Sequence, residues 1–276
     1  MFHSIITSYR NRPYCLKLFL ESLNFSFKYA KKDHEIIIVD LGSKSDKIIN
    51  NFDLPIKRIL VDYNGPFWKT KAINCGVKHS DAYLVSMVDV DSIIMPQWLK
   101  MIENYFICTK KTKLCHRVRF LDAYSKVLKK GITENILNDI VKNGDCYRLA
   151  RERYGEKAII LQNVSPHIIT KDMYENKALG NSHFTIFRDD YLEIGGYDER
   201  FVGHGLEDMD FNLRCFKHLK HGSIKKDIKY NIFHVAHPYE KDWLNNKHRV
   251  KNRVFYHKNK NQGTVKATAV GEWGEF

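Results

Sequence analysis

The stretch 82–88 is largely apolar and is followed at once by two carboxylates, Asp89 and Asp91, with one residue between them. A short apolar run of this kind is typical of a strand that is buried on both faces. Such a strand needs helices on both sides of its sheet, and it delivers the side chains that follow it to the rim. With 43% hydrophobic residues among 276, the chain can fill the core that this arrangement requires.

Segments typical of strands alternate with segments of helical periodicity along the first hundred residues. The expected strands are 4–7, 35–39, 56–61 and 82–88, and the expected helices are 13–30, 68–78 and one that begins at Pro96. This order predicts an α/β fold with a mostly parallel sheet and helices on both faces. Ligands bind such sheets at the carboxyl ends of the strands, where Thr7, Asp40 and the Asp89–Asp91 pair fall.

The second half of the chain is less regular. Residues 110–180 are polar and charged, and we interpret them as an insertion on the acceptor side, with a helix over 134–154 and a strand over 158–164. Strand character returns at 183–188 and 230–235, and residues 239–262 are basic and partly helical in pattern. We therefore expect a single domain over 1–262, followed by a flexible tail over 263–276.

The charge balance favours anionic partners. Forty-five Lys and Arg against 32 Asp and Glu give a net charge of +13, which suits nucleotide phosphates, nucleic acid, an acidic polymer or an anionic membrane surface. A lysine-rich solvated surface would give the same balance. The N-terminus has no pattern of a signal peptide, and no apolar run reaches the roughly 20 residues of a membrane span. With six irregularly spaced cysteines and no CxxC pair, we expect a reduced, cytoplasmic protein without an obligate protein partner.

An Asp-x-Asp pair at a strand end can bind Mg²⁺ or Mn²⁺, and Mn²⁺ also accepts an imidazole. Taken alone the pair is weak evidence, because such pairs are common in solvated loops. His234 and His237 follow the late strand and either could supply the imidazole. The sequence leaves the choice between these two histidines open.

A second acidic pair, Glu207 and Asp208, follows the glycine-rich stretch 195–205. Acidic residues in the first turn of a helix are favoured by the helix dipole, so a structural explanation is available. The four glycines and the histidine of this stretch indicate instead a loop shaped around a ligand. A carboxylate held there could take a proton from an acceptor hydroxyl.

Six segments in this order resemble the GT-A glycosyltransferases of the family-2-like kind, most nearly the transferase modules of bacterial chondroitin polymerases. These segments are 4–12, 38–43, 71–76, 88–98, 195–211 and 233–234. From the first to the last, they span nearly the whole of residues 1–240. Two positions depart from the family pattern: Leu41 replaces a commonly acidic residue, and 203–206 reads Gly-His-Gly-Leu where relatives often carry Trp and a glycine pair.

The resemblance implies a role for each matching position. The nucleotide-sugar would be bound by Thr7, Arg10, Asp40, Lys71, Asn74 and Asp89. The acceptor would be bound by Trp68 and His204, although Trp68 is equally explained by packing. Asp91 and His234 would hold Mn²⁺ or Mg²⁺, Asp208 would be the catalytic base, and Glu207 would orient a substrate.

The function that the resemblance implies is a metal-dependent, inverting hexosyltransferase. It would move a hexose or N-acetylhexosamine from a UDP-sugar to a hydroxyl of a glycan, a lipid-linked molecule or another acceptor. A nucleotidyltransferase could use a similar sheet and Asp-x-Asp pair. The alternative outside this class is a nucleic-acid-associated protein, either a DNA-modifying sugar transferase or a non-catalytic module that binds sugar or nucleic acid.

Overall fold

The structure is a computed structural model. It describes residues 1–43, 48–108, 113–115, 118–120, 128–143, 183–223, 232–235 and 247–276. The strand expected over 158–164, most of the insertion over 110–180, and His237 lie outside the described residues.

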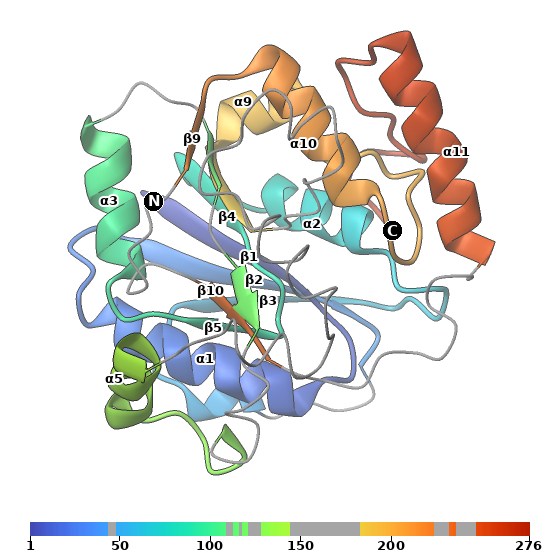
Figure 1. The fold of residues 1–276 in the computed structure, drawn as a ribbon. Coiled ribbons are helices and arrows are strands. Elements are labelled where there is room, and N and C mark those ends of the chain that lie inside the picture. Colours follow the sequence, from blue (N-terminus) through green and yellow to red (C-terminus); the bar gives the residue numbers. More distant parts are fainter. Residues whose placement is uncertain are drawn as a thin grey trace.

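The described residues form a seven-stranded main sheet in the order β3-β2-β1-β4-β8-β6-β9 (Figure 1). Its strands are β1 (His3–Tyr9), β2 (His34–Leu41), β3 (Ile56–Val61), β4 (Leu84–Met87), β6 (Lys113–Cys115), β8 (Phe184–Phe187) and β9 (His221–Ser223). Strands β1 to β4 are parallel to one another, whereas β8 runs antiparallel to both β4 and β6. The predicted α/β fold with a mostly parallel sheet is confirmed.

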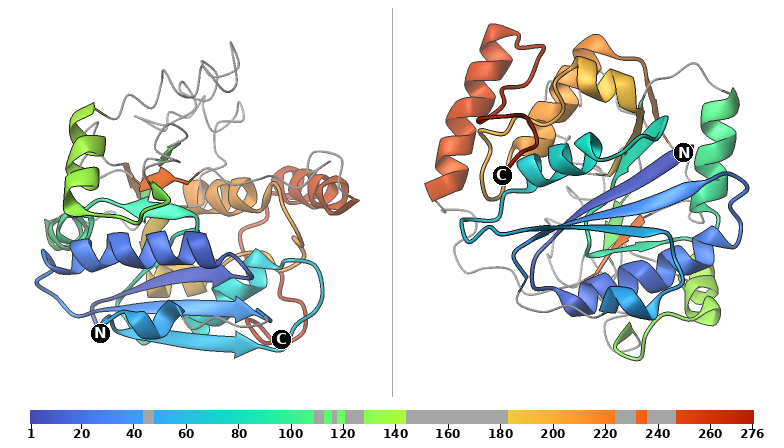
Figure 2. Two further views of the ribbon diagram at one scale, coloured as in Figure 1. Left: turned by 90° about the horizontal axis from the view of Figure 1, so that it is seen from below. Right: turned by 180° about the vertical axis from the view of Figure 1, so that it is seen from behind.

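Helices cover both faces of this sheet, as expected (Figures 1 and 2). They are α1 (Pro13–Phe27), α2 (Lys69–Lys78), α3 (Trp98–Cys108), α5 (Glu134–Asn143), α9 (Arg188–Glu193), α10 (Glu207–His218) and α11 (Lys247–Gln262), with a 3₁₀ turn at Ile48–Asn51. Side chains alternate along β2, so Ile36 packs with α1 and α3 while Ile37 packs with α2 and α10. Among the described residues, no helix is both long and apolar enough to cross a bilayer.

A second, three-stranded sheet lies beside the first and has the order β5-β10-β7. Its strands are β5 (Ser92–Ile94), β10 (Ile232–His234) and β7 (Val118–Phe120). Strand β10 is antiparallel to β5, so His234 pairs with Ser92. The next residue, Val235, donates its N–H to the carbonyl of Asp91 at 2.8 Å. This small sheet therefore brings the end of β10 to the acidic pair.

The C-terminal segment 263–276, expected to be a flexible tail, is instead packed against the core. The backbone N–H of Ala267 donates to the carbonyl of Ile194 at 3.0 Å, and the indole N–H of Trp273 donates to the carbonyl of Gly195 at 3.0 Å. The buried carboxylate of Glu199 accepts the N–H groups of Val270 and Gly274 at 2.9 and 2.8 Å. The segment lacks hydrophobic periodicity, so its residues did not predict order; these hydrogen bonds and the packing of Trp273 against the core hold it.

Candidate functional site

The two carboxylates of the Asp-x-Asp pair face different partners. Asp89 lies 3.0 Å from the ammonium of Lys69, at the start of α2. Asp91 lies 2.8 Å from the guanidinium of Arg12 and 3.6 Å from Nε2 of His234. Buried His183 supports the pair from the protein interior, because its Nε2 accepts the N–H of Asp89 at 3.3 Å. The site therefore has two sides: the Asp89 side, with Lys69, and the Asp91 side, with Arg12 and His234.

Asp91 and His234 are brought together as the sequence predicted. A carboxylate oxygen and an imidazole nitrogen 3.6 Å apart form a donor set that suits Mn²⁺, and Asp91 alone would suit Mg²⁺. Within the part of the chain that the structure describes, no group of three or more His, Cys, Asp or Glu side chains is arranged to hold a metal ion by itself. A divalent ion held here would therefore complete its coordination with substrate oxygens and water.

Lys69 connects the Asp89 side of the site to α10. Its ammonium lies 3.2 and 3.3 Å from the two carboxylate oxygens of Asp208, as well as 3.0 Å from Asp89. Burial opposes the charge on this buried lysine, but the carboxylates of Asp208 and Asp89 outweigh it and raise the pKa of Lys69. The sequence analysis missed Lys69, because nothing local indicated a partner 139 residues away.

Asp208 is held by side chains from outside its own helix. The hydroxyl of Tyr197 donates to its Oδ1 at 2.7 Å, in addition to the contact with Lys69. Helix α10 begins after Leu206, which has a left-handed φ of 72°, and no side chain caps the helix end through a hydrogen bond. Capping of the helix therefore does not account for Asp208 at this position.

Glu207 is buried beside Asp208. Burial, followed by the negative charge of Asp208, raises the pKa of Glu207 to about 7. Its Oε2 has no hydrogen-bond partner within the described ranges. Two neighbouring carboxylates thus differ in environment: Asp208 contacts a cation and a hydroxyl, and Glu207 is set to exchange a proton near neutral pH.

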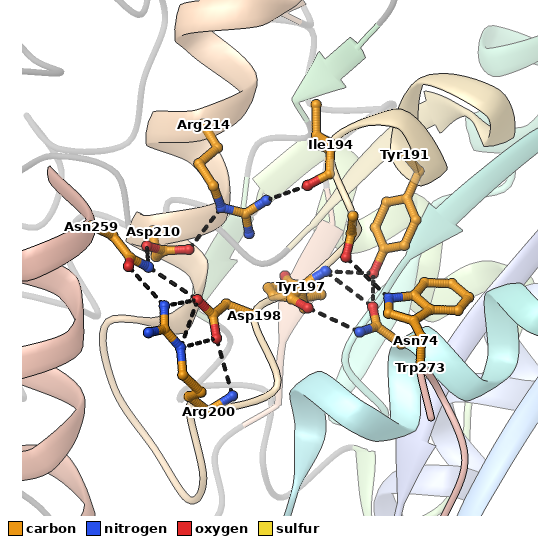
Figure 3. Close-up of polar contacts among 11 residues, drawn as sticks. Asn74, Tyr191, Ile194, Tyr197, Asp198, Arg200, Asp210, Arg214, Asn259 and Trp273 are labelled. Carbon is orange, nitrogen blue, oxygen red and sulfur yellow. Dashed lines mark hydrogen bonds and ion pairs between the residues drawn. The ribbon is translucent and has the colours of Figure 1, made fainter. Parts of the chain in front are cut away.

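A polar network behind α10 fixes its first turns (Figure 3). The amide of Asn259 in α11 donates to Oδ1 of Asp210 at 2.7 Å and to Oδ2 of Asp198 at 3.1 Å. Arg214 donates to Asp210 at 2.9 Å and to the carbonyl of Ile194 at 3.0 Å. Because these groups are almost fully buried, the network holds α10 rigidly and with it the Glu207–Asp208 pair.

The predicted base-recognition residues lie together where β1 and β2 end. Arg10 donates to the carbonyls of Leu41, Gly65 and Tyr63 at 2.5, 2.8 and 3.1 Å, so it connects the end of β2 to the loop after β3. Asp40 is fully buried, accepts the N–H of Ser43 at 2.9 Å and forms an ion pair with Arg58. Thr7 is also fully buried, within β1. Binding of a base by these three residues stays a prediction.

Comparison with known proteins identifies the family. The family model described as "Glycosyltransferase like family 2" matches residues 6–235. The chain belongs to this family. The family expected from the motifs is confirmed. No curated protein matches the chain.

Solved structures show the same fold for this glycosyltransferase. S. aureus TarS 1–349 in complex with UDP-GlcNAc has a TM-score of 0.60 at 14% identity, over 89% of this chain and 61% of that chain. Mannosyltransferase PcManGT from Pyrobaculum calidifontis, in complex with GDP-Man and Mn²⁺, has a TM-score of 0.53 at 12% identity, over 96% of this chain and 65% of that one. The fold is thus GT-A. The chain covers 60% of the length of TarS 1–349.

Two residues expected to bind a nucleotide-sugar, Asn74 and Lys71, make contacts inside the protein. All four hydrogen bonds of buried Asn74 stay inside the protein: its amide donates to Tyr197 and Glu199, and its oxygen accepts from Tyr191 and Tyr197 (Figure 3). Lys71 donates to the carbonyl of Val270 at 2.7 Å. Both side chains help to hold the C-terminal segment or the loop around 197–199, and binding of a nucleotide-sugar by them stays a prediction.

The two predicted acceptor residues lie in different surroundings. Trp68 is half-buried and donates its indole N–H to the carbonyl of Glu199 at 2.8 Å, which favours the packing explanation. His204 is exposed on the loop before α10, with its ring centroid 6.3 Å from that of Phe67. His204 thus lies next to a half-buried aromatic ring, and acceptor binding by it stays a prediction.

Proposed function

We propose that this glycosyltransferase moves a hexose or an N-acetylhexosamine from a UDP-sugar to an acceptor hydroxyl, with inversion at the anomeric carbon. The observation that carries the proposal is the contact of one ammonium, on Lys69, with the carboxylates of both Asp89 and Asp208. It places a residue expected to hold the donor sugar beside a residue able to accept a proton. A sugar bound at Asp89 would then have Asp208 within reach of its anomeric carbon.

The reaction would use these side chains in fixed roles. Asp208 takes the proton of the acceptor hydroxyl, and the acceptor oxygen forms a bond to the anomeric carbon. The bond from that carbon to the diphosphate oxygen breaks, and UDP leaves with the electron pair. Tyr197 holds Asp208 through a 2.7 Å hydrogen bond, so the carboxylate does not have to be ordered when the acceptor binds.

Asp91 and His234 fit a divalent cation, and we propose that they hold Mn²⁺ or Mg²⁺. Such an ion would neutralise the charge that develops on the departing diphosphate. Arg12 lies 2.8 Å from Asp91. Its guanidinium could therefore contact a negatively charged ligand bound on the Asp91 side of the site. PcManGT, a relative in fold, is described with Mn²⁺ bound, which supports the proposal for this chain.

Glu207 suits an orienting role better than the role of base. A carboxyl group whose pKa is raised to about 7 carries a proton part of the time at neutral pH, so it can donate a hydrogen bond to a sugar hydroxyl. Exposed His204 lies on the same loop, two residues before Leu206. We propose that this loop contacts the acceptor, whose identity remains to be measured.

The test is a screen of donor consumption. Purified protein with Mn²⁺ is given UDP-Glc, UDP-Gal, UDP-GlcNAc or UDP-GalNAc, with GDP-Man as the comparison donor, and release of the nucleoside diphosphate is measured. We expect release of UDP from at least one donor and its loss in Asp208→Asn. Consumption of GDP-Man alone would contradict the choice of uridine, and consumption of no donor would contradict the enzymatic proposal.

We also propose the compartment in which the enzyme works and the kind of partner that it meets. We expect it to work in the reducing cytoplasm, and among the cysteines whose side chains are described, those at 15, 75, 108 and 215 are free thiols. Anionic partners remain the expectation from the net charge of +13. Titration of thiols in denatured protein, prepared without reductant, tests the compartment. The chain has six cysteines, so fewer than six reactive thiols would contradict a reducing compartment.

A further inference from the structure

Among the elements of the described structure, helix α11 has the charge that is most strongly of one sign. Its 16 residues include six Lys or Arg and no Asp or Glu. The cationic residues are Lys247, Arg249, Lys251, Arg253, Lys258 and Lys260. The helix lies at the edge of the molecule, beside α10 (Figures 1 and 2). One flank of the protein therefore carries a concentrated positive charge.

The inner face of α11 is fixed to the catalytic side of the protein. The amide of Asn252 donates to the carbonyls of Val202 and Gly205 at 3.0 and 3.1 Å, and Asn259 bonds to Asp210 and Asp198. A Cβ atom added at Gly205 would meet the side chain of Arg249 at 3.2 Å, so loop and helix are in close contact. The helix thus cannot move without moving the loop that precedes Glu207 and Asp208.

The outer face combines an apolar centre with charged borders. Buried Asn252, Tyr256 and Asn259 define the inner side, and at 100° per residue the opposite side is centred on Val250 and Val254. These two valines are 60% and 63% exposed. The exposed side chains that border them are Lys247, Lys251 and Lys258 on one side and Arg253 and His257 on the other. Two exposed aliphatic side chains lie between two rows of basic residues.

We propose that the outer face of α11 docks onto an anionic lipid membrane. Lys and Arg side chains around an exposed apolar line suit a bilayer interface, where the cations meet anionic headgroups and the aliphatic groups enter between them. A nucleic acid or a soluble acidic polymer would satisfy the cations but would place its charged backbone against the valines. The apolar centre of the face therefore favours lipid over a soluble polyanion.

Docking by this face would set the orientation of the enzyme. Because the inner face of α11 contacts the loop 202–206, the loop that carries His204 and leads to Glu207 and Asp208 would be held behind the helix, roughly 10 Å from the membrane surface. An acceptor presented at that surface would reach the site from the loop side. This consequence rests on the proposed function, whereas the docking itself does not.

Vesicle sedimentation tests the proposal with the full chain. The protein is mixed with phosphatidylcholine vesicles that contain or lack phosphatidylglycerol. We expect binding only to the anionic vesicles, weakened by added salt. The variant Lys247→Gln/Lys251→Gln/Lys258→Gln should bind them at least roughly tenfold more weakly. The charge-matched control Lys28→Gln/Lys129→Gln/Lys130→Gln changes exposed lysines in and near α1 and α5, away from α11 (Figure 1), and should bind like the wild type.

A second pair of measurements distinguishes lipid from a soluble polyanion. Val250→Ser/Val254→Ser keeps every charge, so it should lose several-fold in binding to anionic vesicles and nothing in binding to heparin or duplex DNA. Equal binding of this variant and the wild type to vesicles, or equal loss in both triple lysine variants, would overturn the proposal. Thermal unfolding of each variant checks that the fold is intact.

Discussion

The ammonium of Lys69 lies 3.2 Å from the carboxylate of Asp208, across a separation of 139 residues. The same ammonium contacts Asp89 at 3.0 Å. One buried cation thus joins the rim of the parallel sheet to the first turn of α10.

Asp208→Asn tests the base. The change keeps the shape of the side chain but removes the group that accepts a proton. Transfer should fall by roughly 10²- to 10⁴-fold, while UDP affinity stays close to that of the wild type. The measurements are turnover of the donor found in the screen and calorimetric binding of UDP. Turnover close to the wild-type value in a folded variant would remove Asp208 from the mechanism.

Lys69→Gln tests the connection between the two carboxylates. Without the cation, Asp89 and Asp208 are harder to keep ionised together, so turnover should fall at least roughly tenfold and the acid limb of the pH–rate profile should move to higher pH. The matched control is Lys71→Gln, two residues later on the same helix, whose side chain donates to the carbonyl of Val270. It should lower stability and leave the pH profile in place; an identical profile for Lys69→Gln and the wild type would contradict the assignment.

Asp91→Ala and His234→Ala test the metal site. UDP should bind more tightly with Mn²⁺ than without it, because the ion joins the diphosphate to these ligands. Each variant should lose this gain in calorimetry. If only His234→Ala behaves like the wild type, the imidazole of His237 becomes the candidate. An unchanged gain in both single variants would exclude the Asp91–His234 site.

Glu207→Gln tests how the free energy of unfolding depends on pH. The pKa of Glu207 is raised from 4.5 to about 7 in the folded protein, so between these values the folded state binds more protons than the unfolded state. The free energy of unfolding should therefore fall as pH rises through this window, by up to about 3 kcal/mol. Glu207→Gln cannot ionise, so it should show a smaller fall. Denaturant unfolding at pH 5 and pH 8 measures both, and parallel curves would contradict the burial of an ionisable Glu207.

Gly274→Ala tests the packing of the C-terminal segment. A Cβ atom there would lie 3.0 Å from the backbone of Asn74 and Cys75, and the residue has a φ of +70°. The free energy of unfolding should fall by about 1 to 3 kcal/mol. Gly271→Ala is the matched control, since its φ is +75° but nothing lies within 4 Å of the added atom. That variant should lose only roughly 1 kcal/mol, through backbone conformation. Equal losses would mean that the segment does not press against α2.

Local sequence pattern was enough for the parallel part of the fold. The apolar runs at 35–39, 56–61 and 82–88 became β2, β3 and β4, and Pro13 begins α1. Each is encoded in its own residues, because a strand buried on both faces and an amphipathic helix have different periods. The motif order also indicated the family, and it placed Asp91, Asp208 and His234 in a common region before any contact was known.

The sequence by itself therefore determined the strands, the helices and the types of reactive side chain. Tertiary structure decided which of these side chains meet. The pairing of β10 with β5 brought His234 to Asp91, and the packing of α2 against α10 brought Lys69, rather than Lys71, to Asp208. It also turned Asn74 inward and ordered residues 263–276. These outcomes depend on contacts between distant segments, and no local pattern of one segment records the side chain that another segment will present to it.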